Sequence, residues 1–288
     1  MLNKETLKNL KLIIFDLDGS LLKNDGSIGE ETKRLIKKLE DLGVTFSFAT
    51  GRLHSAITKY AEILDVKTPL ISLDGCLIKN HPEGKIIFES FVPTKYVSQV
   101  VGYSEKYPVY VALCHDDAIL YTEKNAFIPE IMDKLGAKYE EVGSYESFVG
   151  ETLEIVLAAD SYTIINNIRE AVTSPFLSRL NTSFYQSHSH PGIYYLEIRK
   201  KGSSKGKGME RLTKYLNIHK KNTAVVCDWY NDISMLQKSV TKIALRNAVD
   251  EVKELADFVT SKTNNEEGAA EFLEQVLISK TNKHARNI

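Results

Sequence analysis

A short apolar run that leads directly into two aspartates constrains the fold of this chain more than any other feature. Residues 10–22 read LKLIIFDLDGSLL, so that Asp16 and Asp18 directly follow the apolar residues. A run of about six apolar residues that ends in a polar turn is typical of a buried strand in a parallel sheet. Ligand sites of such sheets lie just beyond the carboxyl ends of the strands. The sequence therefore predicts an α/β fold with both aspartates at its functional site.

The two aspartates are also expected to share one crevice. Side chains alternate along an extended chain, so Asp16 and Asp18 can point the same way, and two like charges there repel unless a cation joins them. Asp and Gly are also ordinary turn residues, so a plain loop is the alternative. A calcium loop is excluded, because it would need Gly at Leu21 and Glu at Ser27.

Length, charge and cysteine usage limit the class of protein. The 288 residues favour two domains, and the formal net charge of −1, without a basic block, gives no sign of a nucleic-acid surface. Three scattered cysteines without a C-x-x-C spacing fit a reducing compartment better than disulfides. The apolar run near the N-terminus is too short for a signal sequence or a membrane span. We expect a soluble cytoplasmic protein, and the sequence does not determine its oligomeric state.

Strand and helix patterns alternate over the first 84 residues. The segment 30–42 has helical apolar spacing closed by Gly43, and a helix is expected to end near residue 64. Two further strands are expected at 44–49 and 69–72. Each ends in a polar or glycine-bearing turn, as the first strand does, which is the pattern of a doubly wound, mainly parallel sheet with its site along one edge.

The pattern changes after residue 84 and changes back near residue 193. Tyr and Phe are frequent between residues 85 and 191, and the strand and helix patterns there indicate an inserted α+β module with an antiparallel sheet. The sequence thus predicts a core domain formed by residues 1–84 and 193–288, with a cap domain at 85–192. Within the module the strands are expected at 85–91, 109–113, 118–122, 153–158 and 194–198, and the helices at 94–107 and 161–173.

Two further polar clusters lie in the last segment. A strand expected at 223–227 runs into Asp228, which repeats the placement of Asp16, whereas Asn231 and Asp232 could simply cap the helix that follows. The stretch 202–208, GSSKGKG, is not a Walker phosphate loop, because Lys207 stands where that motif needs Gly. Lys205 nevertheless opens a predicted helix, where a cation is a good partner for anions.

Taken in order, four of these segments resemble a known family. They are Asp16-Leu17-Asp18-Gly19-Ser20, Thr50-Gly51-Arg52, Ser204-Lys205-Gly206 and Asp228-x-x-Asn231-Asp232. Together they look like the four motifs of the haloacid dehalogenase superfamily of phosphohydrolases, in the spacing of its Cof-like branch with a type IIB cap. The segments Arg246-Asn247-Ala248 and Glu266-Glu267-Gly268 stand where that branch has related signatures.

The resemblance implies roles for the acidic residues. Unaided hydrolysis of a phosphate monoester is very slow, so a site must supply a nucleophile, charge neutralisation and a proton for the leaving group. In the resembling family the first aspartate attacks phosphorus to give an aspartyl-phosphate, a role that falls to Asp16. Asp18 would protonate the leaving alkoxide and later take a proton from water. Mg²⁺ would be bound by Asp16, the Asp18 carbonyl and Asp228.

The resemblance also implies a phosphate-binding set. Thr50 and the backbone N–H of Gly51 would bind the phosphoryl oxygens, and Lys205 would place a positive charge beside them. Asn231 is expected to bind phosphate or a hydroxyl network. Asp232 is expected to orient Lys205 or a metal-bound water rather than to bind the metal directly.

Arg52 and Asp74 are the candidate substrate contacts. An arginine that opens a helix is as often part of a surface ion pair. Asp74 stands where the branch usually has Asn and adds a negative charge at the rim of the site. Ser20 and Cys227 also depart from the usual Thr and Gly, and Ser20 keeps the hydroxyl.

The sequence therefore predicts a magnesium-dependent phosphatase of small phosphorylated metabolites. Sugar phosphates are the first expectation for the substrate, followed by nucleotide or cofactor phosphates such as those of flavin and pyridoxal. Two alternatives stay open, a phosphosugar mutase and a catalytically inactive sensor of phosphate or metal. Dehalogenation is disfavoured, because the full acidic set suits metal-assisted phosphoryl transfer.

Overall fold

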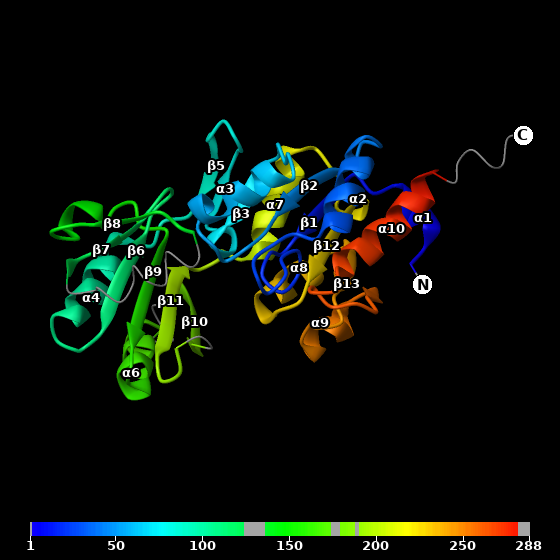
Figure 1. The fold of residues 1–288 in the computed structure, drawn as a ribbon. Coiled ribbons are helices and arrows are strands. Elements are labelled where there is room, and N and C mark those ends of the chain that lie inside the picture. The colour runs from blue at the N-terminus through cyan, green and yellow to red at the C-terminus, as the bar shows by residue number, and fades with distance from the viewer. Residues whose placement is uncertain (1, 124–135, 174–178, 188–189, 282–288) are drawn as a thin grey trace, which may run out of the picture. The chain divides into compact units, whose positions relative to one another are not determined.

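The computed structural model describes residues 2–123, 136–173, 179–187 and 190–281 (Figure 1). The chain divides by its contacts into two compact units. The first comprises Met1–Gly51, Lys59–Ile87 and Ser204–Ile288, and the second comprises Arg52–Thr58 and Phe88–Ser203. Each unit is described separately below. No helix in the described ranges combines the length and the apolar character needed to span a bilayer.

A five-stranded parallel sheet forms the centre of the first unit. The central strand β1 has all four residues buried, as expected for a strand covered on both faces. Its register aligns Leu12 with Thr223 on one side and with Thr45 on the other. The predicted α/β class with a parallel core sheet is therefore confirmed. The strands in spatial order are β14 (Phe258–Val259), β13 (Thr241–Ala244), β12 (Thr223–Cys227), β1 (Leu12–Phe15) and β2 (Thr45–Phe48).

Amphipathic helices accompany this sheet. Helix α2 (Glu30–Glu40) buries Leu35, Ile36 and Leu39, which recur on one helix face, and the chain leaves it through Gly43 at a φ of 78°. Helix α10 packs against α2 and against α1. Further helices described in the segments around this sheet are α1 (Lys4–Lys8), α3 (His54–Ile63), α7 (Lys205–Tyr215), α8 (Ile233–Leu236), α9 (Asp250–Leu255) and α10 (Gly268–Thr281).

A small three-stranded sheet follows α3. Its strands are β3 (Leu70–Ser72), β4 (Leu77–Lys79) and β5 (Ile86–Glu89), in that spatial order. The sequence pattern assigned residues 85–91 to the antiparallel sheet of the inserted module. Because β5 follows β4 through a short connection, it continues the local sheet of β3 and β4 instead, and that part of the prediction is wrong.

The second unit has a six-stranded sheet with its own apolar core. Neighbouring strands are antiparallel except for β7 and β8, which are parallel. Side chains of helices α4 (Thr94–Ser104) and α6 (Tyr162–Thr173) pack with apolar residues of the sheet in one buried cluster. The strands in spatial order are β10 (Leu180–Gln186), β11 (Tyr194–Lys200), β9 (Glu154–Ala159), β6 (Tyr110–Cys114), β7 (Ile119–Tyr121) and β8 (Tyr139–Glu141).

The domain limit expected at residues 192 and 193 lies just before β11, which belongs to the sheet of the second unit. The residues of β11 pair with β9 and with β10, so the tyrosine-rich strand after residue 193 belongs to the six-stranded sheet. The division by contacts accordingly changes at Ser203 and Ser204, where the chain leaves that sheet and enters α7. The domain limits expected from the sequence, 1–84 with 193–288 and 85–192, stay a prediction.

Candidate active site

Acidic side chains meet at the carboxyl ends of β1 and β12, which are neighbours in the central sheet. Asp16 follows β1 directly, and its N–H donates to the carbonyl of Val226 at 3.0 Å. Asp228 follows β12 in the same way. One carboxylate oxygen from each of Asp16, Asp228 and Asp232 lies within 4.8 Å of the others, and all three residues are buried. The two strand-then-acid segments therefore converge, as their parallel pairing requires.

Lys205 neutralises part of this acidic cluster. Its Nζ donates to Asp16 Oδ1 at 2.5 Å and to Asp232 Oδ1 at 2.7 Å, and the residue is only 1% exposed. Lys205 is the first residue of α7, and the Ser204 hydroxyl before it accepts the N–H of Lys207 as a helix cap. The structure thus brings the third and first motifs together through a buried ion pair.

Two glycines allow the backbone segments of the site to approach closely. A Cβ on Gly19, which has a φ of 81°, would lie 2.2 Å from Asp228 Oδ2. A Cβ on Gly206 would lie 2.0 Å from the carbonyl oxygen of Ser234, at the start of α8. A side chain at Gly19 would displace the Asp228 carboxylate, and one at Gly206 would push the start of α7 away from α8.

Asp232 acts as a brace between Lys205 and the loop after β12. Its Oδ2 accepts the N–H groups of Asp228 at 3.0 Å and Trp229 at 3.2 Å, while its Oδ1 accepts Lys205. Both oxygens are therefore engaged with protein donors. The carboxylates that approach one another are those of Asp16, Asp228 and Asp232. The metal ligands expected from the sequence are Asp16, Asp228 and the backbone carbonyl of Asp18.

Burial and mutual repulsion shift the protonation of the cluster. Burial raises the pKa of Asp16 well above its ordinary value, and the charges of Asp232 and Asp228 act in the same direction against Lys205. Burial, and then the charge of Asp232, raises the pKa of Asp228 to about 6. Burial lowers the pKa of Lys205, but its neighbours Asp16, Asp232 and Asp74 outweigh that effect and hold it well above its ordinary value. The cluster is short of positive charge.

Asp18 is an exposed residue in the loop after β1, whose other residues from Leu17 to Leu22 are buried or half-buried. The N–H of Leu21 donates to the carbonyl of Asp16 at 3.2 Å, and that of Leu22 donates to the carbonyl of Leu17 at 2.8 Å. Between them, the Ser20 hydroxyl donates to Asp228 Oδ1 at 2.8 Å. Asp18 is exposed while Asp16 is buried, so the two aspartates of one motif have very different surroundings.

A second set of site residues, Thr50, Gly51 and Asp74, lies just after the ends of β2 and β3. The N–H of Asp74 donates to the carbonyl of Thr50 at 3.0 Å, and Asp74 Oδ1 accepts the amide of Asn231 at 3.1 Å. Asp74 has a φ of 48°, in the left-handed region, and a Cβ on Gly51 would lie 3.5 Å from its Oδ1. Asp74 therefore links Thr50, Gly51 and Asn231. By its contacts, Arg52 belongs to the second compact unit.

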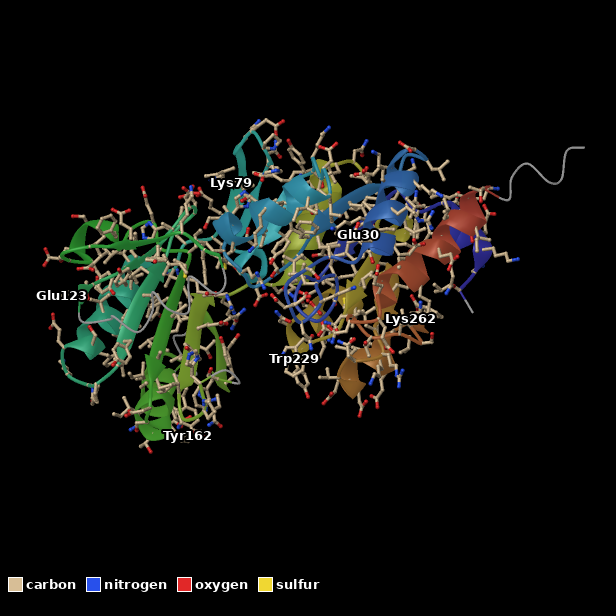
Figure 2. All side chains as sticks on the ribbon, viewed as in Figure 1. Glu30, Lys79, Glu123, Tyr162, Trp229 and Lys262 are labelled. Carbon is tan, nitrogen blue, oxygen red and sulfur yellow. The ribbon has the colours of Figure 1, made fainter. Side chains whose placement is uncertain are left out.

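Several contacts of the site were not predicted from the sequence. The Ser234 hydroxyl accepts the N–H of Gly206 at 2.9 Å, and Asn247 donates to the carbonyl of Gly19 at 2.8 Å. Trp229, labelled in Figure 2, is 47% exposed although it lies between buried Asp228 and the Tyr230–Asp232 turn. Asn247 stands in the segment already noted for its resemblance, which is the one available signal for its contact.

Comparison with known proteins gives consistent results over nearly the whole chain. A family model described as haloacid dehalogenase-like hydrolase matches residues 13–273. A Bacillus subtilis relative, named 5-amino-6-(5-phospho-D-ribitylamino)uracil phosphatase YitU, is 27% identical over 270 residues, covering 92% of this chain and 96% of the relative.

Solved structures agree on the fold. A haloacid dehalogenase-like hydrolase from Bacteroides thetaiotaomicron superposes with a TM-score of 0.82 at 20% identity, covering 93% of this chain and 99% of that one. A structure described as the HAD subclass IIB sugar phosphatase BT4131 superposes with a TM-score of 0.75 at 22% identity, covering 92% and 98%.

Proposed function

The chain belongs to the haloacid dehalogenase-like hydrolases, and on that premise we propose a magnesium-dependent phosphatase of small metabolites that acts through an aspartyl-phosphate. The observation that supports this most is the buried contact of Lys205 with Asp16, beside Asp228. A carboxylate held next to a cation and a second acid suits attack on a phosphoryl group, because the negative charge of both reactants must be neutralised.

Asp16 is the proposed nucleophile and Asp18 the proposed acid and base. Asp16 Oδ1 is bound to Lys205, which fixes the carboxylate at the end of β1, where a phosphoryl group can meet it. Asp18 lies two residues further along the chain and is exposed, so it can deliver a proton to a leaving alkoxide and remove one from water. The burial of one aspartate and the exposure of the other support this division of roles.

Asp16, Asp228 and the backbone carbonyl of Asp18 are the proposed Mg²⁺ ligands. The residues fit the ion, since they offer the oxygen atoms that Mg²⁺ prefers and since the Lys205 ammonium neutralises only part of the buried acidic cluster, in which Asp16 and Asp228 have raised pKa values. When bound, Mg²⁺ would neutralise charge on the phosphoryl oxygens. Asp232 is proposed to orient Lys205 rather than to bind the ion, because both of its oxygens already accept protein donors.

Thr50, the Gly51 N–H, Lys205 and Asn231 are the proposed phosphate-binding groups. Asn231 donates its amide to Asp74, so Asp74 holds this side chain in place from the end of β3. A direct contact of Asp74 or Arg52 with the substrate stays a proposal. The charge of Asp74 would disfavour substrates with further anionic groups near the phosphate.

The proposed substrates are small phosphorylated metabolites, with sugar phosphates first. The name of the YitU relative adds a phosphorylated ribitylamino-uracil to the compounds worth testing. Nucleotide and cofactor phosphates follow. The burial of Cys76, Cys114 and Cys227 as free thiols supports the proposed cytoplasmic location.

Two other functions use the same cluster and are distinguished by their products. A phosphosugar mutase would convert one sugar phosphate into another with little release of phosphate. A sensor would bind phosphate or metal without turnover. The exposed position of Asp18 favours the phosphatase, since the acid and base can reach both a leaving group and water.

The test is release of inorganic phosphate from a panel of sugar, nucleotide, cofactor and ribitylamino-uracil monoesters, with Mg²⁺ or with chelator. We expect Mg²⁺-dependent turnover that Asp16→Asn abolishes. Asp41→Asn is the matched control, because Asp41 only ends α2, and it should retain full activity. A folded protein that releases no phosphate from any ester would overturn the proposal, and isomerised sugar phosphate would favour the mutase.

A further inference from the structure

Two asparagines from the C-terminal part of the chain bind the loop that holds Asp18. Asn247 lies in the turn between β13 and α9, and its Nδ2 donates to the carbonyl of Gly19 at 2.8 Å. Asn264 follows β14, and its N–H donates to Asn247 Oδ1 at 2.9 Å. The two asparagines thus form one connected unit, whose first contact is to the residue directly after Asp18.

Asn264 binds the other end of the same loop. It is only 6% exposed, and its Nδ2 donates to the carbonyl of Leu22 at 2.9 Å and to Asn24 Oδ1 at 3.0 Å. A buried primary amide that donates twice to one loop fixes the position of the loop backbone. Because the N–H of Leu22 donates in turn to Leu17, both sides of the loop around Asp18 are held.

The turn that contains Asn247 also binds the loop of Asp228. The N–H of Val249 donates to the carbonyl of Asp228 at 3.0 Å, and the N–H of Leu245 donates to the carbonyl of Cys227 at 3.2 Å. The turn that contains Asn247 therefore contacts both the loop of Asp18 and the loop of Asp228, and it holds the two loops at a fixed spacing. None of the phosphatase roles proposed above uses Asn247 or Asn264.

We propose that Asn247 and Asn264 are positioning residues, an amide clamp that holds Asp18 where it can protonate the leaving group. This inference rests on the proposed phosphatase function. Asp18 itself is exposed, and loss of the anchor on the Gly19 carbonyl would let the Gly19–Ser20 peptide rotate. A proton donor displaced by about 1 Å loses much of its effect, up to a hundredfold.

The position of Asn247 makes a purely structural role insufficient to explain it. Its side chain is exposed, and an exposed hydrogen bond contributes little to stability. Asn247→Ala should therefore stay folded, and its effect should be read from the chemistry. Asn264→Ala removes a buried amide and serves as the second, less stable variant.

The experiment compares two esters whose leaving groups differ in their need for a proton. We would measure kcat/KM for an alkyl phosphate and for p-nitrophenyl phosphate at saturating Mg²⁺, because kcat/KM includes only the steps up to release of the alcohol. Nitrophenolate leaves without an acid, whereas an alkoxide does not. Asn247→Ala should lower kcat/KM about tenfold for the alkyl ester and less than twofold for the aryl ester.

Two control variants show whether the loss of kcat/KM in Asn247→Ala arises through Asp18. Arg246→Ala changes the exposed neighbour in the same turn, whose guanidinium contacts Ser261 and Glu266 and should alter neither ester. In an Asp18→Asn background, Asn247→Ala should cause no further loss on the alkyl ester. Equal loss on both esters, or a loss that persists in the Asp18→Asn background, would overturn the clamp.

Amide hydrogen exchange of residues 18–22 tests the clamp independently of turnover. Exchange should be faster in Asn247→Ala than in the wild type, and unchanged in Arg246→Ala. Unchanged exchange in Asn247→Ala would overturn the clamp even in an active enzyme. A wild type that hydrolyses no ester would instead contradict the phosphatase function, and faster exchange would then still support the clamp.

Discussion

Lys205 Nζ lies 2.5 Å from Asp16 Oδ1, although the two residues are 189 positions apart in the chain. Both are buried, so this pair joins the start of α7 to the end of β1 in the interior of the first unit. Buried ion pairs are costly unless further hydrogen bonds satisfy them, and here Asp232 binds the same ammonium group. The arrangement links the stability of the core to the proposed chemistry.

Replacement of Lys205 by Met should damage both activity and stability. Loss of the cation beside the proposed nucleophile should lower kcat about a hundredfold or more. It would also leave Asp16 and Asp232 without their shared partner, at a cost of about 3 kcal/mol in the free energy of unfolding. Steady-state kinetics and urea unfolding would measure the two effects.

Lys207→Met is the matched control for this prediction. Lys207 lies two residues further along α7 and forms an exposed pair with Glu210 at 3.1 Å. Such pairs contribute about 0.5 kcal/mol, so this variant should resemble the wild type. Retention of wild-type kcat by Lys205→Met would show that the buried pair is structural only.

Replacement of Ser20 by Ala should weaken metal binding more than catalysis at saturating metal. The Ser20 hydroxyl donates to Asp228 Oδ1 at 2.8 Å and orients that carboxylate. Its loss should raise the Mg²⁺ concentration needed for half-maximal activity by about tenfold, as is typical for partners of metal ligands. Ser20→Thr keeps the hydroxyl and should restore the Mg²⁺ dependence, and an identical dependence in all three proteins would contradict this role.

Asp228 should make the metal-free protein less stable as the pH rises. Burial raises the pKa of Asp228 to about 6 from an ordinary value of 3.8. Between these values the folded state binds more protons than the unfolded state, so the contribution of Asp228 to the free energy of unfolding falls as pH rises from about 4 to 6. In chelator at pH 7, Asp228→Asn should therefore be more stable than the wild type, on the order of 2 kcal/mol.

The difference in the free energy of unfolding between Asp228→Asn and the wild type, measured below pH 4 and with Mg²⁺, checks the sign of this effect. Below pH 4 the difference between Asp228→Asn and the wild type should vanish, since both states of the wild type are then protonated. Mg²⁺ at pH 7 should remove the advantage of Asp228→Asn, because it stabilises only the protein that keeps the ligand. Urea unfolding over this pH range is the measurement, and equal stability in chelator at pH 7 would refute the cause assigned here.

Replacement of Glu267 by Ala should destabilise the first unit by about 1 to 2 kcal/mol. Glu267 Oε2 accepts the N–H of Thr32 at 2.9 Å and its hydroxyl at 3.1 Å, and so caps α2 from the other end of the chain. The residue before α2, Gly29, makes no side-chain cap. Urea unfolding should show a lower midpoint for Glu267→Ala.

Glu30→Ala is the matched control in the same helix. Glu30 has 89% of its side chain exposed and pairs with Lys33 at helical spacing. Its loss should leave the urea midpoint close to that of the wild type, because solvent screens an exposed pair. A Glu267→Ala variant as stable as Glu30→Ala would mean that α2 is not capped in this way in solution.

The sequence predicts the central sheet well because its strands are continuous apolar runs. Strand β12 has the limits expected for it, 223–227, and β2 lies within a residue of its predicted limits, 44–49. Strand β10 was not expected, because LNTSFYQ is mostly polar, and its place depends on pairing with β11. Such pairing is a tertiary effect that local patterns do not contain.

The candidate site shows the same contrast. Parallel strands that each end in acid predict that Asp16 and Asp228 converge, and the structure brings them together. The sequence also predicts that Asp232 orients Lys205, and the two side chains are in contact. The bonds of Asp232 to two backbone N–H groups of the loop after β12 were not predicted, because they depend on how that loop turns back on itself. The contacts of Asn264 depend on a loop more than two hundred residues away.

The insertion of the second unit has a consequence for how the chain is made. Ser20 and Asp228, which share a hydrogen bond, are 208 residues apart, and β1 finds its partner β12 only after the whole insertion has been synthesised. A nascent chain that ends before residue 223 therefore lacks three of the five strands of the central sheet, and its β1 keeps an unpaired apolar edge. The acidic cluster of Asp16, Asp228 and Asp232 is among the last parts of the protein to assemble, because contacts between residues far apart in the sequence form slowly.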